Sequence, residues 1–329
     1  MGMVTTARSM MRSAEPVIDR LVAPGAYLAG KFLGALKNRM PRFPASKAAL
    51  IKSRVWPIQD HYYEPMFNPV HLTKPLDADR DLPGIRWNVE GQLQLLQEMR
   101  YGAELELFKE EDRHGEGRFF FRNDMFEWCD ADYWYSIVRH FKPSKIMEIG
   151  SGYSTLMAQA AIAKNAKEHA AYACDHLCIE PYEAPWLERA GVTRVLRQKV
   201  QDVDLGVFLT LKRNDILFID SSHVIRPQGD VLTEFLQLLP RLQPGVIVHV
   251  HDIFSPRDYP REWIVDNTRL WNEQYLLEAF LSENDRWQIL GATNYLFHHH
   301  YEELRATCPH TKSPTKPRWE PSSFYIQHL

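Results

Sequence analysis

From Lys145 onward, short apolar runs alternate with segments of helical spacing, and this alternation limits the fold more than any other feature. The apolar runs end in polar residues and cover 145–150, 176–180, 192–200, 215–220 and 246–254. Helical segments lie between them, after 152 and over 185–191 and 230–242. Strands that alternate with helices form a parallel sheet, because each helix carries the chain back to the same edge. The sequence therefore predicts an α/β fold with a doubly wound, mostly parallel sheet and helices on both faces.

The chain before this body differs from it in composition. Residues 1–54 carry ten Lys and Arg against two Asp and Glu, whereas residues 55–329 carry 29 against 40, so a basic arm of net charge +8 precedes an acidic body of −11. Prolines dominate the start of 55–142, followed by predicted helices over 91–107 and 130–141 and a short predicted strand over 118–122. We expect three parts: a basic N-terminal arm (1–54), a cap or lid region (55–142) and the sheet domain (143–329), whose C-terminal segment adds a second lid.

The basic arm contains one amphipathic pattern. Leu28, Phe32 and Leu36 recur at helical spacing among Lys31 and Lys37, which predicts a short basic helix. Such a helix can contact a membrane surface or dock a partner, or it can pack in a homo-oligomer or remain solvated. We expect a homo-oligomer and leave these alternatives open.

Cysteine usage and hydropathy indicate the compartment. The four cysteines are too few for a disulfide framework, and we expect reduced structural thiols at Cys129, Cys174, Cys178 and Cys308. The apolar stretch from Leu21 to Leu36 is interrupted and too short to span a bilayer, which needs about 20 apolar residues. No clean signal-peptide pattern begins the sequence, so the expected location is cytoplasmic.

Polar residues follow the predicted strands, where ligands of such sheets bind. Gly150 and Gly152 let the backbone pass close to a ligand, and Glu180 after the second strand can accept both hydroxyls of a ribose. A dinucleotide-binding fingerprint would have a glycine at the position of Thr155. It would also have an acidic residue about 20 residues after the glycines, whereas Glu180 lies 28 residues past Gly152. Both departures weigh against a nicotinamide dehydrogenase, and the missing G-K-[ST] excludes a P-loop.

The segment from Glu148 to Thr155 (EIGSGYST) resembles the first motif of class I S-adenosylmethionine-dependent methyltransferases, and Glu180 matches their ribose-binding acid. The resemblance runs from about Lys145 to Asp252 and continues through 253–256, 271–275 and 322–325. It implies a Rossmann-like fold and S-adenosylmethionine as cofactor. The residues it assigns to the cofactor are Glu148, Gly150, Ser151, Gly152, Ser154, Thr155, Glu180, Gln201, Asp202 and Asp220, with Gln201 and Asp202 near the adenine. Turn glycines and surface carboxylates are the structural alternatives.

Methyl transfer from a sulfonium is an in-line displacement, so the protein must align the acceptor and remove the proton of an alcohol. His223 follows Asp220 by three residues, past a predicted strand end. Histidine has a reference pKa of ~6.5, so it can accept a proton at working pH. His223 is the predicted general base, against the alternative of a hydrogen-bonded loop histidine.

The fifth predicted strand ends in His249-Val250-His251-Asp252. Asp220 and Asp252 end neighbouring strands, so their carboxylates can converge. The set resembles the divalent-metal site of macrocin-type sugar O-methyltransferases and of catechol-type enzymes, except that an oxygen ligand is expected in place of His251. The resemblance implies a metal at Asp220, His251 and Asp252 (Mg, Mn or Fe); the alternative is that His251 and Asp252 bind the substrate directly, without a metal.

The acceptor follows from charge and aromatic content. An acidic body disfavours nucleic acid, because phosphate binding requires a basic face. Aromatic side chains near the predicted site suit a sugar or a flat small molecule. We therefore expect O-methylation of a hydroxyl on a small molecule or sugar in a biosynthetic pathway, with His223, Asp220, Asp252 and His251 as catalytic residues. The rival hypothesis is a catalytically silent module that binds S-adenosylmethionine as a partner or sensor.

Overall fold

A computed structural model describes residues 2–111, 117–312 and 319–329, with side chains from residue 15 onward except for Lys312. The chain divides into two compact units, Met1–Thr73 and Lys74–Leu329. This division does not coincide with the expected boundaries at 54 and 142. Residues 74–142 belong to the same unit as the sheet, because α3 (Val89–Glu98) packs on β6 (Trp287–Ala292) and α5 (Trp128–Phe141) packs on α6 (Tyr153–Glu168).

The N-terminal unit is helical. It contains α1 (Gly2–Lys37), a 3₁₀ turn at Met40–Arg42, α2 (Pro44–Ser53) and a second 3₁₀ turn at Pro69–His71. The predicted short helix is therefore part of a 36-residue helix. Met40 is the one buried apolar side chain described in this unit. Among the described residues, none of the helices combines the length and apolarity needed to cross a membrane.

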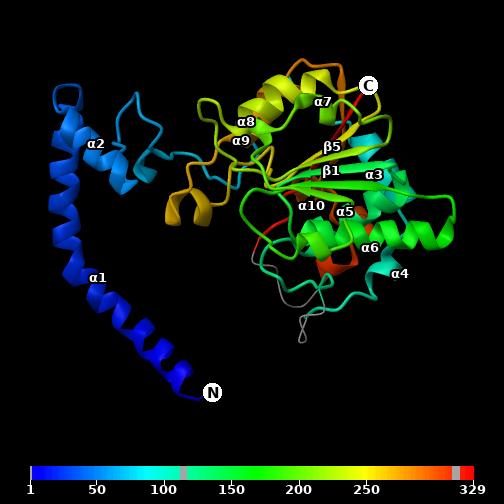
Figure 1. Ribbon diagram of the computed structural model, residues 1–329, viewed down its shortest axis with the longest axis horizontal. Helices are drawn as coiled ribbons and strands as arrows, with labels where there is room; N and C mark the ends of the chain where they lie inside the picture. The colour runs from blue at the N-terminus through cyan, green and yellow to red at the C-terminus, as the bar shows by residue number, and fades with distance from the viewer. Residues whose placement is uncertain (1, 112–116, 313–318) are drawn as a thin grey trace. The chain divides into compact units, whose positions relative to one another are not determined.

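The second unit is built on a seven-stranded sheet in the order β3-β2-β1-β4-β5-β7-β6 (Figure 1). The strands are β1 (Lys145–Ile149), β2 (Asp175–Ile179), β3 (Arg194–Leu196), β4 (Ile216–Ile219), β5 (Ile247–Val250), β6 (Trp287–Ala292) and β7 (Phe324–His328). β1 to β5 pair in parallel, and β7 runs antiparallel to both β5 and β6. The strand order reverses between β1 and β4, which is the switch point where such sheets bind ligands.

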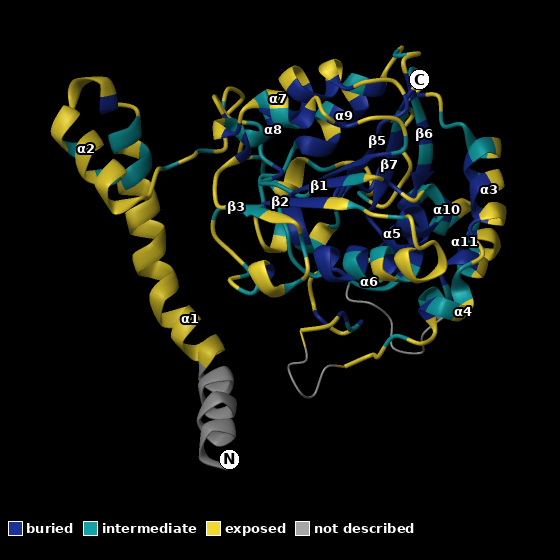
Figure 2. Cartoon of the chain, turned by 45° about the vertical axis from the view of Figure 1, so that its right-hand side comes forward, coloured by how far each residue is buried: buried dark blue, intermediate teal, exposed yellow. Residues whose placement is uncertain are grey.

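Helices cover both faces of this sheet, as predicted (Figures 1 and 2). Alternate residues of each strand point to opposite faces: Ile216 and Phe218 join the core under α5 and α6, whereas Leu217 and Ile219 join the core under α7 to α9. The helices are α3 (Val89–Glu98), α4 (Gly102–Leu105), α5 (Trp128–Phe141), α6 (Tyr153–Glu168), α7 (Leu205–Phe208), α8 (Asp230–Leu232), α9 (Glu273–Leu281), α10 (Thr293–His299) and α11 (Tyr301–Thr307). Short 3₁₀ or π turns lie at Leu187–Arg189, Val200–Asp202, Thr233–Leu238, Leu239–Arg241, Glu262–Asp266 and Pro309–Lys312.

Five predicted elements differ. The helix expected over 185–191 is reduced to the 3₁₀ turn at Leu187–Arg189, and the strand expected over 192–200 to β3. The strand expected at 118–122 does not form; Phe119 and Phe121 are buried in the core, and Phe121 N donates to Lys109 O at 3.0 Å outside any sheet. The single helix expected over 230–242 is divided into α8, a π turn and a 3₁₀ turn. The helix expected over 91–107 breaks between α3 and α4.

Candidate active site

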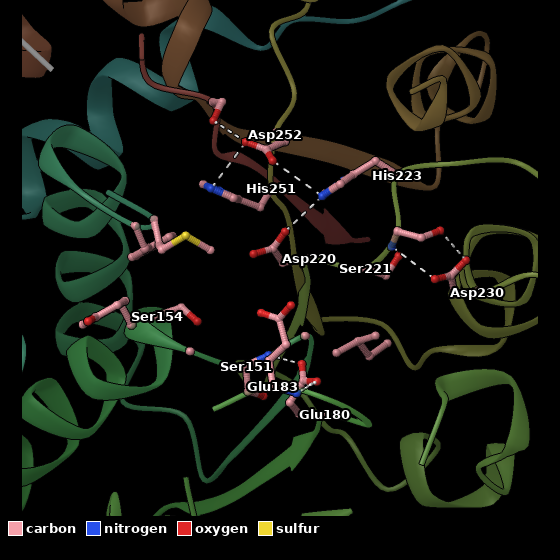
Figure 3. A pocket seen from close by; sticks show the side chains of 18 of the residues that line it. Ser151, Ser154, Glu180, Glu183, Asp220, Ser221, His223, Asp230, His251 and Asp252 are labelled. Carbon is pink, nitrogen blue, oxygen red and sulfur yellow. Dashed lines mark hydrogen bonds and ion pairs between the residues drawn. The ribbon is translucent and has the colours of Figure 1, made fainter. Parts of the chain in front are cut away.

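A cavity of about 1300 Å³ opens at the carboxyl ends of the parallel strands (Figure 3). The loops after β1 to β5 line it, and the segments before α5, α9 and β7 complete its wall. The predicted residues Ser151, Ser154, Glu180, Asp220 and His223 all face this space. His251 and Asp252 do so as well, so the structure brings the whole predicted catalytic set into one pocket.

The loop after β1 depends on a glycine with a left-handed backbone. Gly150 has a φ of +77°, and a Cβ built there would lie 1.8 Å from the backbone oxygen of Asp220. Only glycine fits where the ends of β1 and β4 approach this closely. Gly152, in contrast, has no atom within 4 Å of a built Cβ and borders the cavity. The two glycines therefore have different roles: Gly150 allows the ends of β1 and β4 to approach each other, and Gly152 leaves room for a ligand.

Glu180 is held by the backbone that follows it. Its Oε1 accepts hydrogen bonds from the amides of Tyr182 and Glu183 at 2.7 and 2.8 Å. Its Oε2 faces the Ser151 amide at 3.4 Å, across the space between the loops after β1 and β2 (Figure 3). This carboxylate is thus fixed at the pocket wall with one oxygen directed toward the first loop.

Three predicted cofactor residues do not line the cavity. Glu148 and Thr155 are fully buried and bonded to each other, Thr155 Oγ1 donating to Glu148 Oε2. This bond joins the end of β1 to the start of α6 behind the loop. Asp202 is exposed at the end of its 3₁₀ turn, whereas its neighbour Gln201 reaches the cavity wall.

His223 stands between three carboxylates. Its Nε2 lies 3.2 Å from Asp220 Oδ1 and 3.5 Å from Asp252 Oδ2, and its Nδ1 hydrogen-bonds with Glu273 Oε2 at 2.8 Å. The ring packs at 4.2 Å from that of Trp271. One nitrogen thus faces the pocket between two aspartates, while the buried Glu273 fixes the other.

These contacts shift the pKa values in the site. Burial alone would lower the pKa of His223, but hydrogen bonds with Asp220 and Glu273 and the charge of Asp252 raise it well above its usual value. Burial would likewise raise the pKa of Asp220, yet His223 and His251 hold it below its ordinary range. The carboxyls of Asp252 and Glu273 have raised pKa values because burial disfavours their charged forms. His223 is therefore a strong base in a negatively charged wall.

His251 and Asp252 are held by the start of β7. Ser322 Oγ donates to Asp252 Oδ1 at 3.2 Å, and Ser323 Oγ lies 3.4 Å from His251 Nδ1. Asp130 in α5 accepts from the amides of both serines, at 3.0 and 2.9 Å. Asp130 thus connects α5 to the catalytic wall, although it is outside the predicted set.

The candidate metal ligands group differently from the prediction. One ligand atom from each of Asp220, His223 and Asp252 lies within 4.8 Å of the others. His251 Nε2 is 3.6 Å from Asp252 Oδ1 but stands outside this group. The third candidate ligand beside the two aspartates is therefore His223, whereas the prediction named His251.

Comparisons with known proteins give a family model, a relative and a solved structure. A family model described as a methyltransferase domain matches residues 147–253, which hold the parallel strands and their loops. An uncharacterized protein of Archaeoglobus fulgidus is 30% identical over 167 residues, which cover 47% of this chain and 74% of that protein. The solved O-methyltransferase from Bacillus cereus, in complex with SAH, is 13% identical and covers 72% of this chain and 90% of its own, with a TM-score of 0.34. Residues 147–253 therefore form a methyltransferase domain.

Proposed function

We propose that this enzyme transfers the methyl group of S-adenosylmethionine to a hydroxyl oxygen of a small molecule or sugar, with His223 as general base. The observation that carries the proposal is the orientation of His223: Nδ1 is bonded to the buried Glu273, and Nε2 points into the cavity between Asp220 and Asp252. A buried carboxylate behind a histidine fixes the ring and stabilises the proton that it accepts, as in hydrolase triads.

The cofactor fits the wall formed by the loops after β1 and β2. Gly152 leaves space beside the chain, and Glu180 offers a carboxylate oxygen for ribose hydroxyls. The sulfonium is positively charged, and Asp220 and Asp252 supply negative charge at the same strand ends. The positive charge of the sulfonium lowers the pKa of His223, because a nearby positive charge disfavours the imidazolium.

In the reaction, the acceptor O–H proton moves to Nε2 of neutral His223 as the oxygen attacks the methyl carbon. The bond between carbon and sulfur breaks, and its electron pair remains on the sulfur of S-adenosylhomocysteine. Asp220 and Asp252 orient the hydroxyl, and Glu273 stabilises the imidazolium that forms. Positioning and proton removal are the protein's main contributions, because the donor is already activated.

An aromatic wall next to His223 supports a small-molecule or sugar acceptor. The guanidinium of Arg269 lies 4.7 Å from the ring of Trp263 and 4.5 Å from that of Trp271, and all three side chains line the cavity. Indole rings pack well against the apolar face of a sugar, and a guanidinium donates hydrogen bonds to its oxygens. The acceptor hydroxyl then lies between this wall and the cofactor.

The donor types at Asp220, His223 and Asp252 also suit a divalent transition-metal ion. Such an ion would bind the Nε2 that takes the proton, so a metal-ligand role and a base role for His223 exclude each other.

The first test of the function is acceptor-dependent turnover. Incubation with S-adenosylmethionine and a panel of sugars and phenols is expected to release S-adenosylhomocysteine with one acceptor class, and mass spectrometry should find one added methyl group on that acceptor. Tight cofactor binding without turnover on any hydroxyl would instead favour the silent binding module.

Metal removal gives a separate prediction. After dialysis against EDTA, turnover is expected to stay within about twofold of the untreated rate, because proton transfer to His223 requires no ion. Adding Mg²⁺, Mn²⁺ or Fe²⁺ should not raise it. A lost rate that one of these ions restores would replace the base role of His223 with a metal-dependent mechanism.

A further inference from the structure

The N-terminal unit exposes most of the large apolar side chains on the described surface. Of 23 such exposed side chains, 16 lie within residues 17–70, less than a fifth of the chain. They are Val17, Ile18, Leu21, Val22, Tyr27, Leu28, Phe32, Phe43, Ile51, Val55, Trp56, Ile58, Tyr62, Tyr63, Met66 and Val70. Figure 2 shows α2 and the described part of α1, from residue 15 onward, as mostly exposed. Soluble monomers rarely expose apolar residues at this density, so this surface is suited to an interface.

The two sides of α1 identify what covers it. At 100° per residue, Leu21, Leu28 and Phe32 share one side and are 76%, 68% and 66% exposed. The opposite side presents small residues, among them Ala26 and Gly30, and a Cβ built at Gly30 meets nothing within 4 Å. A helix that lies on a membrane directs a strongly charged side toward water. On the described part of α1 this opposite side also carries Glu15, Asp19 and Lys37. Its charges are mixed and not predominantly basic, which favours protein contact over contact with an anionic lipid surface.

Charge points to the same occupant. Between residues 15 and 37 the acids are Glu15 and Asp19 and the bases are Arg20, Lys31 and Lys37, a net charge of only +1. Lys37 also forms an ion pair with Glu64. The whole arm of residues 1–54 is nonetheless basic (+8), and the rest of the chain is acidic (−11). The acidic body of another copy of the chain therefore attracts the basic arm.

The exposed area is large enough for a stable assembly. Sixteen side chains at roughly 100 Å² each exceed the ~800 Å² that each partner of a standard interface buries. We propose that the apolar surface of residues 17–70 is an interface with a second copy of this chain. The arm serves assembly, and the chemistry takes place in the cavity of the second unit.

Sedimentation velocity on the full-length chain tests this proposal. At micromolar concentration the wild type is expected to sediment as a dimer or larger oligomer, and the double variant Leu21→Glu/Phe32→Glu as a monomer. The matched control is Leu236→Glu, a 59% exposed leucine of the second unit, which should leave the assembly unchanged. Binding of S-adenosylhomocysteine by each variant reports whether the second unit is folded.

The two added charges of the double variant could unfold α1, so a second, uncharged variant is needed. Leu28→Gln removes apolar area without adding charge, and it is expected to raise the dissociation constant by roughly 10-fold or more. A monomeric wild type would overturn the proposal. So would a double variant that still assembles, or a wild type that is monomeric in solution and pellets with vesicles of phosphatidylglycerol and phosphatidylcholine.

Discussion

Replacing His223 with glutamine is expected to lower kcat by about 10²–10⁴-fold, the usual contribution of a positioned general base. Glutamine retains much of the volume and can still hydrogen-bond with Asp220 or Glu273, but it cannot accept the proton of the acceptor hydroxyl. The dissociation constant of S-adenosylhomocysteine should change by less than about threefold, because the Glu180 side of the pocket is untouched. Steady-state kinetics and calorimetry separate the two effects.

The control for that variant is Ser222→Ala. Ser222 is adjacent in sequence, but its Oγ bonds with Asp230 Oδ1 at 2.7 Å, away from His223. It should therefore retain most of the activity. If His223→Gln kept a near wild-type kcat, another group would have to take the proton, and His223 would be a structural residue of the loop after β4.

Glu273 acts through His223, so its substitution should move the pH profile as well as the rate. The raised pKa of His223 means that turnover increases with pH as the imidazolium loses its proton. Glu273→Gln keeps a hydrogen-bond acceptor for Nδ1 and removes a negative charge, which lowers the pKa of His223 and shifts the midpoint of the rising limb to lower pH. An unshifted midpoint with a reduced rate would indicate that Glu273 only packs against the loop.

The parallel half of the sheet was predictable because its signal is local. Strands buried on both faces are continuous apolar runs, and each ends in polar residues. β6 and β7 lack this signal: they are antiparallel, and β7 enters the sheet between β5 and β6 although it is last in sequence. The segment RFFFR has strand composition, yet no described strand pairs with it, and Phe119 and Phe121 are buried in the helical core instead. Composition alone does not determine where a segment finds partners.

The carboxylates around His223 were likewise only partly predictable from the sequence. Asp220 and Asp252 follow β4 and β5, which pair in parallel register, so their proximity follows from the predicted topology. Glu273 lies 50 residues after His223 and reaches it only because the loop before α9 returns to the site, where the Asn272 amide donates to His223 O at 3.0 Å. The sequence shows an acid at the start of a helix there, but no spacing rule links it to His223.

The loop glycines give the prediction with the largest structural effect. Gly150→Ala is expected to destabilise the fold by about 3 kcal/mol or more. The left-handed backbone conformation disfavours a side chain, and the new methyl group overlaps the carbonyl of Asp220. This carbonyl belongs to the backbone and cannot rotate away. It should also abolish S-adenosylhomocysteine binding, since the ends of β1 and β4 must separate.

Gly152→Ala separates cofactor binding from folding, because its built Cβ meets no protein atom and projects at the cavity wall. In thermal unfolding, S-adenosylhomocysteine should raise the wild-type Tm by mass action. Gly152→Ala should unfold much closer to the wild-type Tm than Gly150→Ala does and lose most of the ligand-induced increase. A Gly150→Ala protein with both a wild-type Tm and a full ligand shift would show that the loop tolerates a side chain, and the close approach of β1 to Asp220 would then not be what shapes the cofactor site.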